Sequence, residues 1–115
     1  MLKNLTKKNI IADKIKICRS IFSKTLGLMF TKPIKDKCLI FVFEKKTKIN
    51  LHMFFVFYPI DVVFLDKNKK VIEIKENFKP FRIYNSKKKA NYVIELPCSS
   101  IRQKNIEIND LITFA

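Results

Sequence analysis

The chain contains very little glycine. One glycine occurs in 115 residues, where average usage would supply about eight. Phosphate-binding loops and dinucleotide-binding fingerprints need several closely spaced glycines, so both are excluded. The single Gly27 follows a segment with helical spacing, residues 20–26, and is predicted to cap that helix with left-handed backbone. With only four prolines beside this glycine, the chain has little of the composition that is typical of a disordered linker. We therefore expect disorder only at the ends, in particular at residues 1–8.

Cysteines and long apolar runs are also scarce. Cys18, Cys38 and Cys98 match neither a C-x-x-C motif nor a zinc spacing, so we predict buried, reduced thiols, no metal site and no cofactor. The longest apolar stretch is interrupted by Pro59 and Asp61 and stays below the roughly 20 residues that span a bilayer. Residues 1–16 lack the continuous hydrophobic core of a signal peptide. These observations predict a cytoplasmic protein without a transmembrane segment.

Acidic residues and arginines are few. Lys plus Arg total 24 against 10 Asp plus Glu, and the net charge of +14 suggests a polyanionic partner such as nucleic acid. Nearly all the cations are lysines spread over the predicted loops, whereas arginine favours bidentate phosphate and base contacts. We therefore interpret the charge first as a solvated basic surface. A nucleic-acid-associated module is the alternative, and its best combination of charge with a stacking aromatic is Arg82, Tyr84, Lys87, Lys88 and Lys89.

The residues that are abundant favour strands. The chain is 48% apolar with 11 Phe, which is enough for one core in a single domain, residues 1–115. Asn68 is expected to be left-handed in a hairpin turn at residues 66–69. Residues 9–17 are predicted to form a strand or a strand pair with a turn near Asp13. Further extended segments are predicted at residues 38–43, 50–58, 60–65, 70–76, 91–96 and 106–114, with charged loops at 44–48 and 85–90. The predicted class is mainly β, α+β at most: a compact, barrel-like antiparallel or mixed sheet with one short helix at residues 20–26.

Three polar residues stand among apolar strand residues and form the candidate ligand site: His52, Asp61 and Glu95. A carboxylate with apolar neighbours is costly to bury, so Asp61 and Glu95 should each accept hydrogen bonds from specific donors. The structural alternative is that Asp61 pins a neighbouring loop, His52 is packed in the core and Glu95 caps a strand end. A metal site formed by the three has no support in their spacing. A nucleophilic pair of Cys98 with His52 has no supporting motif.

Separated motifs of the chain resemble those of one known family. In chain order these are Gly27-Leu28-Met29-Phe30, Leu39-Ile40-Phe41-Val42-Phe43, His52-Met53-Phe54-Phe55, Pro59-Ile60-Asp61-Val62-Val63-Phe64-Leu65-Asp66, Val93-Ile94-Glu95-Leu96-Pro97 and Asn109-Asp110. Over about residues 17–114 the chain resembles the family called domain of unknown function 192. The resemblance implies a small, mostly β, barrel-like domain with one short helix, and no established activity. We assign structural roles to Gly27, Pro59, Asp61 and Asp110.

The chain departs from the family pattern at two turns. The family usually has glycine after the Glu-Leu-Pro segment and before the final Asp, where this chain has Ser99 or Ser100, and Asn109. Asparagine tolerates left-handed backbone, so the second change is mild. If a glycine turn closely approaches a ligand in other members, the serine puts that approach in doubt here.

Three functions from different classes remain. The first is a non-catalytic domain that binds a small molecule or peptide in a pocket near His52, Asp61 and Glu95. The second is the basic nucleic-acid-associated module. The third is a hydrolase-like enzyme that uses His52 with a carboxylate and needs a perturbed titration in an open cleft. We rank them in that order, with an enzyme less expected than a binding domain.

Overall fold

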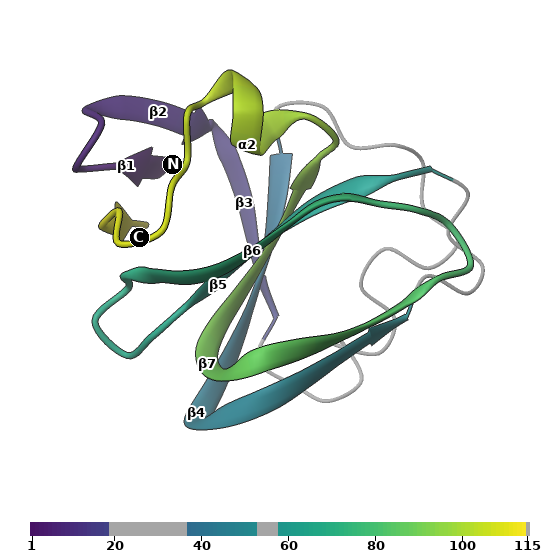
Figure 1. Ribbon diagram of the computed structural model, residues 1–115. Helices are drawn as coiled ribbons and strands as arrows, with labels where there is room; N and C mark the ends of the chain where they lie inside the picture. Colours follow the sequence, from purple (N-terminus) through teal and green to yellow (C-terminus); the bar gives the residue numbers. More distant parts are fainter. Residues whose placement is uncertain (19–36, 53–57, 115) are drawn as a thin grey trace.

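A computed structural model describes residues 1–18, 37–52 and 58–114 (Figure 1). The elements are β1 (Leu2–Asn4), β2 (Asn9–Ala12), β3 (Lys14–Cys18), β4 (Lys37–His52), β5 (Ile60–Leu65), β6 (Val71–Phe78), β7 (Ile83–Pro97), the helix α2 (Ser100–Gln103) and β8 (Ile112–Thr113). The prediction of a mainly β fold is confirmed. Gly27 and the helix predicted at residues 20–26 lie outside the described residues.

The described strands form two sheets that do not close into a barrel, whereas the sequence predicted one barrel-like sheet. The larger sheet has the order β3-β4-β7-β5-β6, and the smaller sheet has the order β2-β1-β8. The β3–β4 pair is parallel, and the other pairs are antiparallel, which makes the larger sheet mixed. The smaller sheet lies with α2 at one end of the larger sheet (Figure 1).

Strand β5 lies between β7 and β6 in the larger sheet and is buried along its whole length, because side chains cover both faces of that sheet. Val63 and Leu65 belong to the hydrophobic cluster on one face, together with Ile94 and Leu96 of β7. The alternate residues of the two strands belong to the cluster on the other face: Ile60, Val62, Phe64 and Val93. Because of this alternation, the position of a polar residue in β5 or β7 determines which face of the sheet its side chain points to.

Strand β1 lies within residues 1–8, the segment for which the sequence predicts disorder. Leu2 of β1 is completely buried, and β1 pairs with β2 on one side and with β8 on the other. The two ends of the chain therefore meet in the smaller sheet (Figure 1). The break between β2 and β3 falls at Asp13, where a turn was predicted.

Two predicted loops are strand. Residues 44–48 continue β4 and residues 85–90 continue β7, so these two strands pair from Leu39↔Glu95 to His52↔Ile83. The hairpin turn after β5 occurs as predicted, but the left-handed residue is Lys69, with φ 64°, and not Asn68. Among the described residues, no helix is long and apolar enough to cross a membrane.

Candidate functional site

Asp61 is the second residue of β5, and its carboxylate binds the backbone of two other segments. Its Oδ1 accepts a hydrogen bond from the backbone N–H of Asn77 at 2.9 Å, and its Oδ2 accepts one from the N–H of Ile101 at 2.9 Å. Asp61 is only 1% exposed, so these donors offset much of the cost of removing its charge from water. Asp61 therefore holds the end of β6 and the first turn of α2 against β5.

A polar pocket opens beside this carboxylate. Its volume is about 310 Å³. Six residues line it: Asp61 from β5, Glu76 and Asn77 from β6, Cys98 and Ser99 after β7, and Arg102 from α2. The walls thus present two carboxylates, a guanidinium group, an amide, a hydroxyl and a thiol, which suits a small ligand with several polar groups.

Two residues of the pocket have left-handed backbone without being glycine. Asn77 has φ 50° and Ser99 has φ 73°. Such a conformation disfavours a residue with a Cβ, and asparagine tolerates it better than serine does. Ser99 precedes α2 where the family pattern usually has glycine, and Asn109 is also left-handed, with φ 77°. Both turns therefore have left-handed backbone in this chain, although neither position is glycine.

The expectation that every cysteine is buried is wrong for Cys98. Its thiol lines the pocket and lies 3.6 Å from Oδ1 of Asn77. Cys38 is completely buried, and burial raises the pKa of its thiol to about 12, which makes it a poor nucleophile. The side chain of Cys18 lies outside the described residues.

Glu95, the second predicted carboxylate, does not reach this pocket. Asp61 pairs with Leu96 and Val62 pairs with Glu95, so the two acids point to opposite faces of the sheet. Burial raises the pKa of Glu95 to about 8. Its Oε2 is buried, and no described residue donates a hydrogen bond to it. The two carboxylates therefore cannot ligate one metal ion or share one proton.

His52, the third predicted residue, is placed by its backbone alone. It is the last residue of β4 and pairs with Ile83, the first residue of β7. Cys98 follows Pro97, the last residue of the same strand β7, so the whole of β7 separates the two. Asp61 pairs with Leu96, near the end of β7 that Cys98 follows, whereas His52 pairs at the other end of β7.

The residues proposed for nucleic-acid binding are exposed except for Tyr84, which is half-buried. Arg82 and the three lysines Lys87, Lys88 and Lys89 are exposed. The ring of Tyr84 instead packs 5.9 Å from Phe64 and 6.2 Å from Phe78, centroid to centroid. Its hydroxyl donates to the carboxylate of Glu73. Burial, followed by this hydrogen bond, raises the pKa of Tyr84 to about 12, so the ring is not a free stacking platform.

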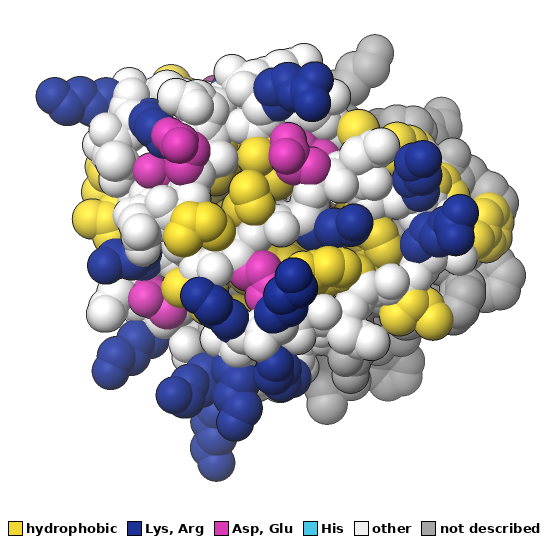
Figure 2. Space-filling view, in the orientation of Figure 1, with side chains coloured by type: hydrophobic (Ala, Val, Ile, Leu, Met, Phe, Trp, Pro, Cys, Tyr) yellow, Lys and Arg dark blue, Asp and Glu magenta, His cyan; other side chains and the backbone are white. Residues whose placement is uncertain are grey.

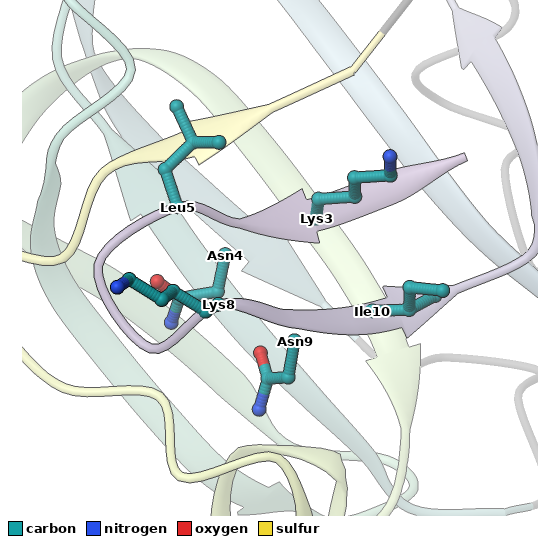
Figure 3. Close-up of a pocket in the computed structure, with 6 residues that line it drawn as sticks. All are labelled: Lys3, Asn4, Leu5, Lys8, Asn9 and Ile10. Atoms are coloured by element: carbon teal, nitrogen blue, oxygen red, sulfur yellow. The ribbon is translucent and has the colours of Figure 1, made fainter.

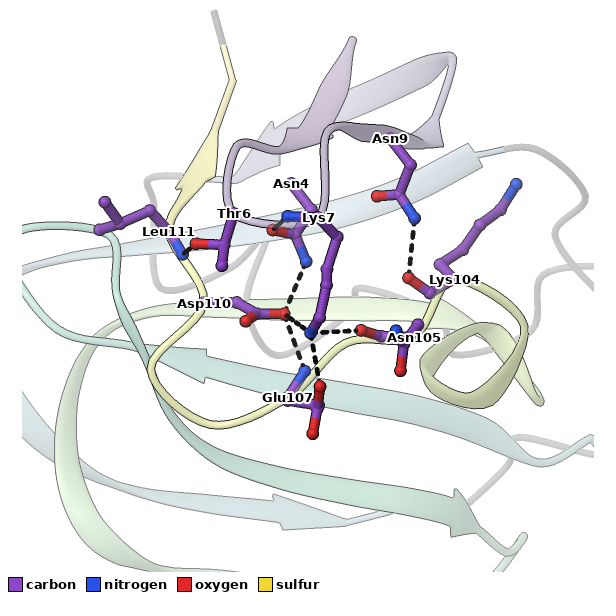
Figure 4. Close-up of polar contacts among 9 residues, drawn as sticks. All are labelled: Asn4, Thr6, Lys7, Asn9, Lys104, Asn105, Glu107, Asp110 and Leu111. Carbon is purple, nitrogen blue, oxygen red and sulfur yellow. Dashed lines mark hydrogen bonds and ion pairs between the residues drawn. The ribbon is translucent and has the colours of Figure 1, made fainter.

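Asp110 lies in a separate polar network that joins the two ends of the chain (Figure 4). Its Oδ2 accepts hydrogen bonds from Asn4 Nδ2 and Lys7 Nζ, both at 2.8 Å, and from the N–H of Glu107 at 3.0 Å. Lys7 Nζ also lies 2.7 Å from Oε1 of Glu107. Burial opposes ionisation of Asp110, but Lys7 and Asn4, with the Glu107 N–H, hold its pKa below the ordinary value. This network fastens the β1–β2 hairpin to the loop before β8.

A second hollow lies on the β1–β2 hairpin and has a volume of about 500 Å³. Lys3, Asn4, Leu5, Lys8, Asn9 and Ile10 line it. These side chains point in several directions from the hairpin (Figure 3). Asn9 uses its Nδ2 to bind the carbonyl of Lys104 at 2.9 Å, as Figure 4 also shows. The hollow thus lacks the convergent polar groups of the Asp61 pocket.

Sequence reasoning found one residue of the pocket and missed its walls. Asp61 was recognisable because a carboxylate stood among apolar residues. The missed residues were Glu76, Asn77, Ser99 and Arg102, which look like ordinary surface positions in the sequence. Cys98 was considered as a buried thiol and as a nucleophile paired with His52, but not as a pocket residue. The one available signal was the serine that replaces the family's glycine beside Cys98.

The fold and the pocket define a small, mainly β domain with two open sheets and a polar cleft at the end of its central strands. The chain belongs to the family called domain of unknown function 192, whose family model, described as an uncharacterised ACR, matches residues 3–114. The resemblance predicted from the motifs is thereby confirmed.

Relatives and solved structures agree with this assignment. A UPF0127 protein from Thermococcus sibiricus is 39% identical over 114 residues, which cover 97% of this chain and 73% of that protein. One from Pyrococcus horikoshii is 39% identical over 99 residues, 84% of each chain. A crystal structure from Sinorhizobium meliloti, described as a "putative transcription regulator", has a TM-score of 0.81 at 20% identity, covering 86% of this chain and 79% of that one. A protein of unknown function from Novosphingobium aromaticivorans also has a TM-score of 0.81, at 18% identity, covering 87% and 74%. These two structures show the fold.

Proposed function

We propose that the chain is a non-catalytic binding domain and that the pocket beside Asp61 holds a small zwitterionic ligand, such as an amino acid or the end of a peptide. The observation that carries the proposal is the pocket wall, where Glu76 and Arg102 supply opposite charges. A ligand ammonium group would pair with Glu76, and a ligand carboxylate would pair with the guanidinium of Arg102. Asn77 and Ser99 add donors and acceptors that would fix its orientation.

The role proposed for Asp61 is to hold the pocket in shape. Both of its oxygens already accept backbone hydrogen bonds, so it is poorly placed to act as a general base. A pocket wall that is already ordered before the ligand binds lowers the conformational entropy lost on binding. In this proposal Asp61 supports the pocket, and Glu76 and Arg102 contact the ligand. These roles favour binding over catalysis.

The proposal is tested with three compounds that differ by one charge. Alanine is the zwitterion, N-acetylalanine lacks the ammonium group, and alanine amide lacks the carboxylate. We expect alanine to shift the amide resonances of Asn77, Ser99 and Arg102 in a saturable titration. The other two compounds should bind at least tenfold more weakly, because each leaves one charged wall residue unpaired.

Matched variants identify the residues responsible. Arg102→Gln and Glu76→Gln should each weaken alanine binding at least tenfold. Arg82→Gln and Glu44→Gln remove the same charges from exposed positions that do not line the pocket and should leave binding unchanged. Saturable shifts that map to another surface, or no saturable shift with any of the three compounds, would overturn the proposal.

A further inference from the structure

Six exposed lysines gather where β4 and β7 bend together. We define the lysine patch as Lys45, Lys46 and Lys48 on β4 with Lys87, Lys88 and Lys89 on β7. Figure 2 shows Lys and Arg side chains crowded at the lower end of the molecule, over the region where Figure 1 places this bend. In the sequence these lysines fall in two separate segments that were predicted to be loops. Only the pairing of β4 with β7 reveals that they share one surface.

Two irregularities in the β4–β7 ladder present the lysines to solvent. Between the pairs Val42↔Tyr92 and Thr47↔Ala90, β4 has more residues than β7, and Lys45 and Lys46 lie in this bulge. Between Lys48↔Lys89 and Asn50↔Asn85 the excess is on β7, and it includes Lys87 and Lys88. Bulges bend the strand and redirect its side chains. The two bulges therefore bring four lysines to the same bend.

The pair that separates the bulges has like charges. Lys48 and Lys89 lie directly opposite each other, an arrangement that destabilises an antiparallel ladder. Within residues 1–18, 37–52 and 58–114, no lysine of the patch forms an ion pair. Lys48 Nζ donates to the backbone carbonyl of Lys87, and the patch thus carries positive charge that no ion pair among these residues neutralises.

Glu73 holds the β7 segment of the lysine patch in place by accepting backbone hydrogen bonds. Its carboxylate accepts the backbone N–H of Lys87 at 2.9 Å and 3.0 Å and that of Lys88 at 2.9 Å. The hydroxyl of Tyr84 also donates to it. Because Glu73 is only 8% exposed and receives these donors, it holds the bulge in place and offers little competition for an anion outside.

We propose that the lysine patch binds the phosphate backbone of a nucleic-acid duplex without reading its sequence. This goes beyond the proposed function, because it uses a surface distinct from the Asp61 pocket. Lysines that neutralise phosphates supply a salt-dependent affinity that is independent of sequence. The patch contains no arginine, which is the commonest partner for guanine edges, so base-specific contact is not part of the proposal.

The surroundings of the patch favour a duplex over other polyanions. Single-stranded nucleic acid is usually held by aromatic side chains that stack on its bases, but the ring of Tyr84 is packed against Phe64 and Phe78. Insertion into a bilayer interface needs exposed apolar side chains. None of the exposed large apolar residues of the described chain lies within the patch segments 44–48 and 87–89.

The test measures binding of a fluorescent 24-base-pair DNA duplex between about 50 and 200 mM salt. If all six lysines neutralise phosphates, the slope of log K against log salt should be roughly −5, and affinity should fall about 10³-fold over this range. A variant that carries Lys45→Gln, Lys46→Gln, Lys88→Gln and Lys89→Gln should flatten the slope by roughly 3 to 4. It should also bind at least tenfold more weakly at the lower salt concentration.

The matched control carries Lys14→Gln, Lys16→Gln, Lys67→Gln and Lys70→Gln. It removes the same net charge from exposed lysines outside the patch and should keep most of the affinity. An equal loss in both variants would show that total charge and not the patch is responsible, which would overturn the proposal. No binding of wild type at 50 mM salt, tighter binding of a single strand of the same length, or binding of phosphatidylserine vesicles in place of the duplex would also overturn it.

Discussion

Asp61 Oδ1 accepts the backbone N–H of Asn77 at 2.9 Å, although Asn77 is sixteen residues away and has left-handed backbone. The other oxygen of the same carboxylate binds the N–H of Ile101 at the start of α2. One buried side chain thus fixes both segments that form the pocket walls. This relationship explains why a charged residue is kept in a strand that is otherwise apolar.

Replacement of Asp61 should destabilise the whole domain. In Asp61→Ala the N–H groups of Asn77 and Ile101 lose their acceptor, so the free energy of unfolding should fall by about 1–3 kcal/mol. Urea denaturation measures the loss, and hydrogen exchange should accelerate at these two amides. Asp13→Ala, at an exposed position between β2 and β3, is the control and should change stability by less than about 0.5 kcal/mol. An Asp61→Ala protein as stable as wild type would contradict the supporting role.

Ser99→Gly should stabilise the protein. Glycine adopts the observed φ of 73° without the steric cost that a Cβ carries. We expect the free energy of unfolding to rise by about 0.5–1 kcal/mol, measured by thermal denaturation. Ser99→Ala keeps the Cβ and removes only the hydroxyl, so it should give no such gain. Equal effects of Ser99→Gly and Ser99→Ala would show that the backbone conformation is not the cause.

Glu95 should make the protein less stable as the pH rises. Its pKa in the folded state is about 8 and its ordinary value is 4.5, so the folded state binds the proton more tightly than the unfolded state. Its stabilising contribution is present below the ordinary value and is lost towards pH 8, at roughly 1.4 kcal/mol per pH unit at most. Urea denaturation at about pH 5 and pH 8 should show this loss in wild type.

Glu95→Gln is the matched variant, because the amide keeps the shape and stays neutral. It should remove most of the pH dependence over that range. If wild type and Glu95→Gln lose stability in parallel, another group is responsible for the pH dependence.

The Asp110 network predicts the opposite dependence. The pKa of Asp110 is held below its ordinary value of 3.8, so its contribution is present above that value and is lost as the pH falls further. Asp110→Asn should lower the free energy of unfolding at neutral pH by about 1–3 kcal/mol. The difference from wild type should shrink below about pH 3.8. Glu107→Gln, which breaks only the exposed ion pair with Lys7, should cost less than about 1 kcal/mol.

Local sequence patterns predicted much of the β fold. The continuous apolar run at residues 38–43 lies in β4, and the predicted segments 60–65 and 91–96 lie in β5 and β7. The turns near Asp13 and at residues 66–69 are present. Residues 44–48 and 85–90 misled the prediction because lysines there hide the β periodicity. Both segments are strand because they pair with each other, through bulges that Glu73 and Ser86 help to satisfy. Such long-range pairing leaves no local signal.

The candidate site was less accessible to sequence reasoning. Asp61 could be recognised from its apolar neighbours, since burial demands specific donors. Its grouping with Glu95 failed because the sequence did not give the register between β5 and β7, and a difference of one residue reverses the face of a side chain. Arg102 and Glu76 reach the pocket through tertiary structure that brings α2 and β6 together.

The most direct measurement is a crystal structure of the protein grown with millimolar alanine. We expect alanine in the pocket beside Asp61, with its carboxylate paired to Arg102, its ammonium group paired to Glu76, and the Asp61 bonds to Asn77 and Ile101 intact. A pocket without alanine at a saturating concentration, or alanine bound only at another surface, would contradict the proposed binding function.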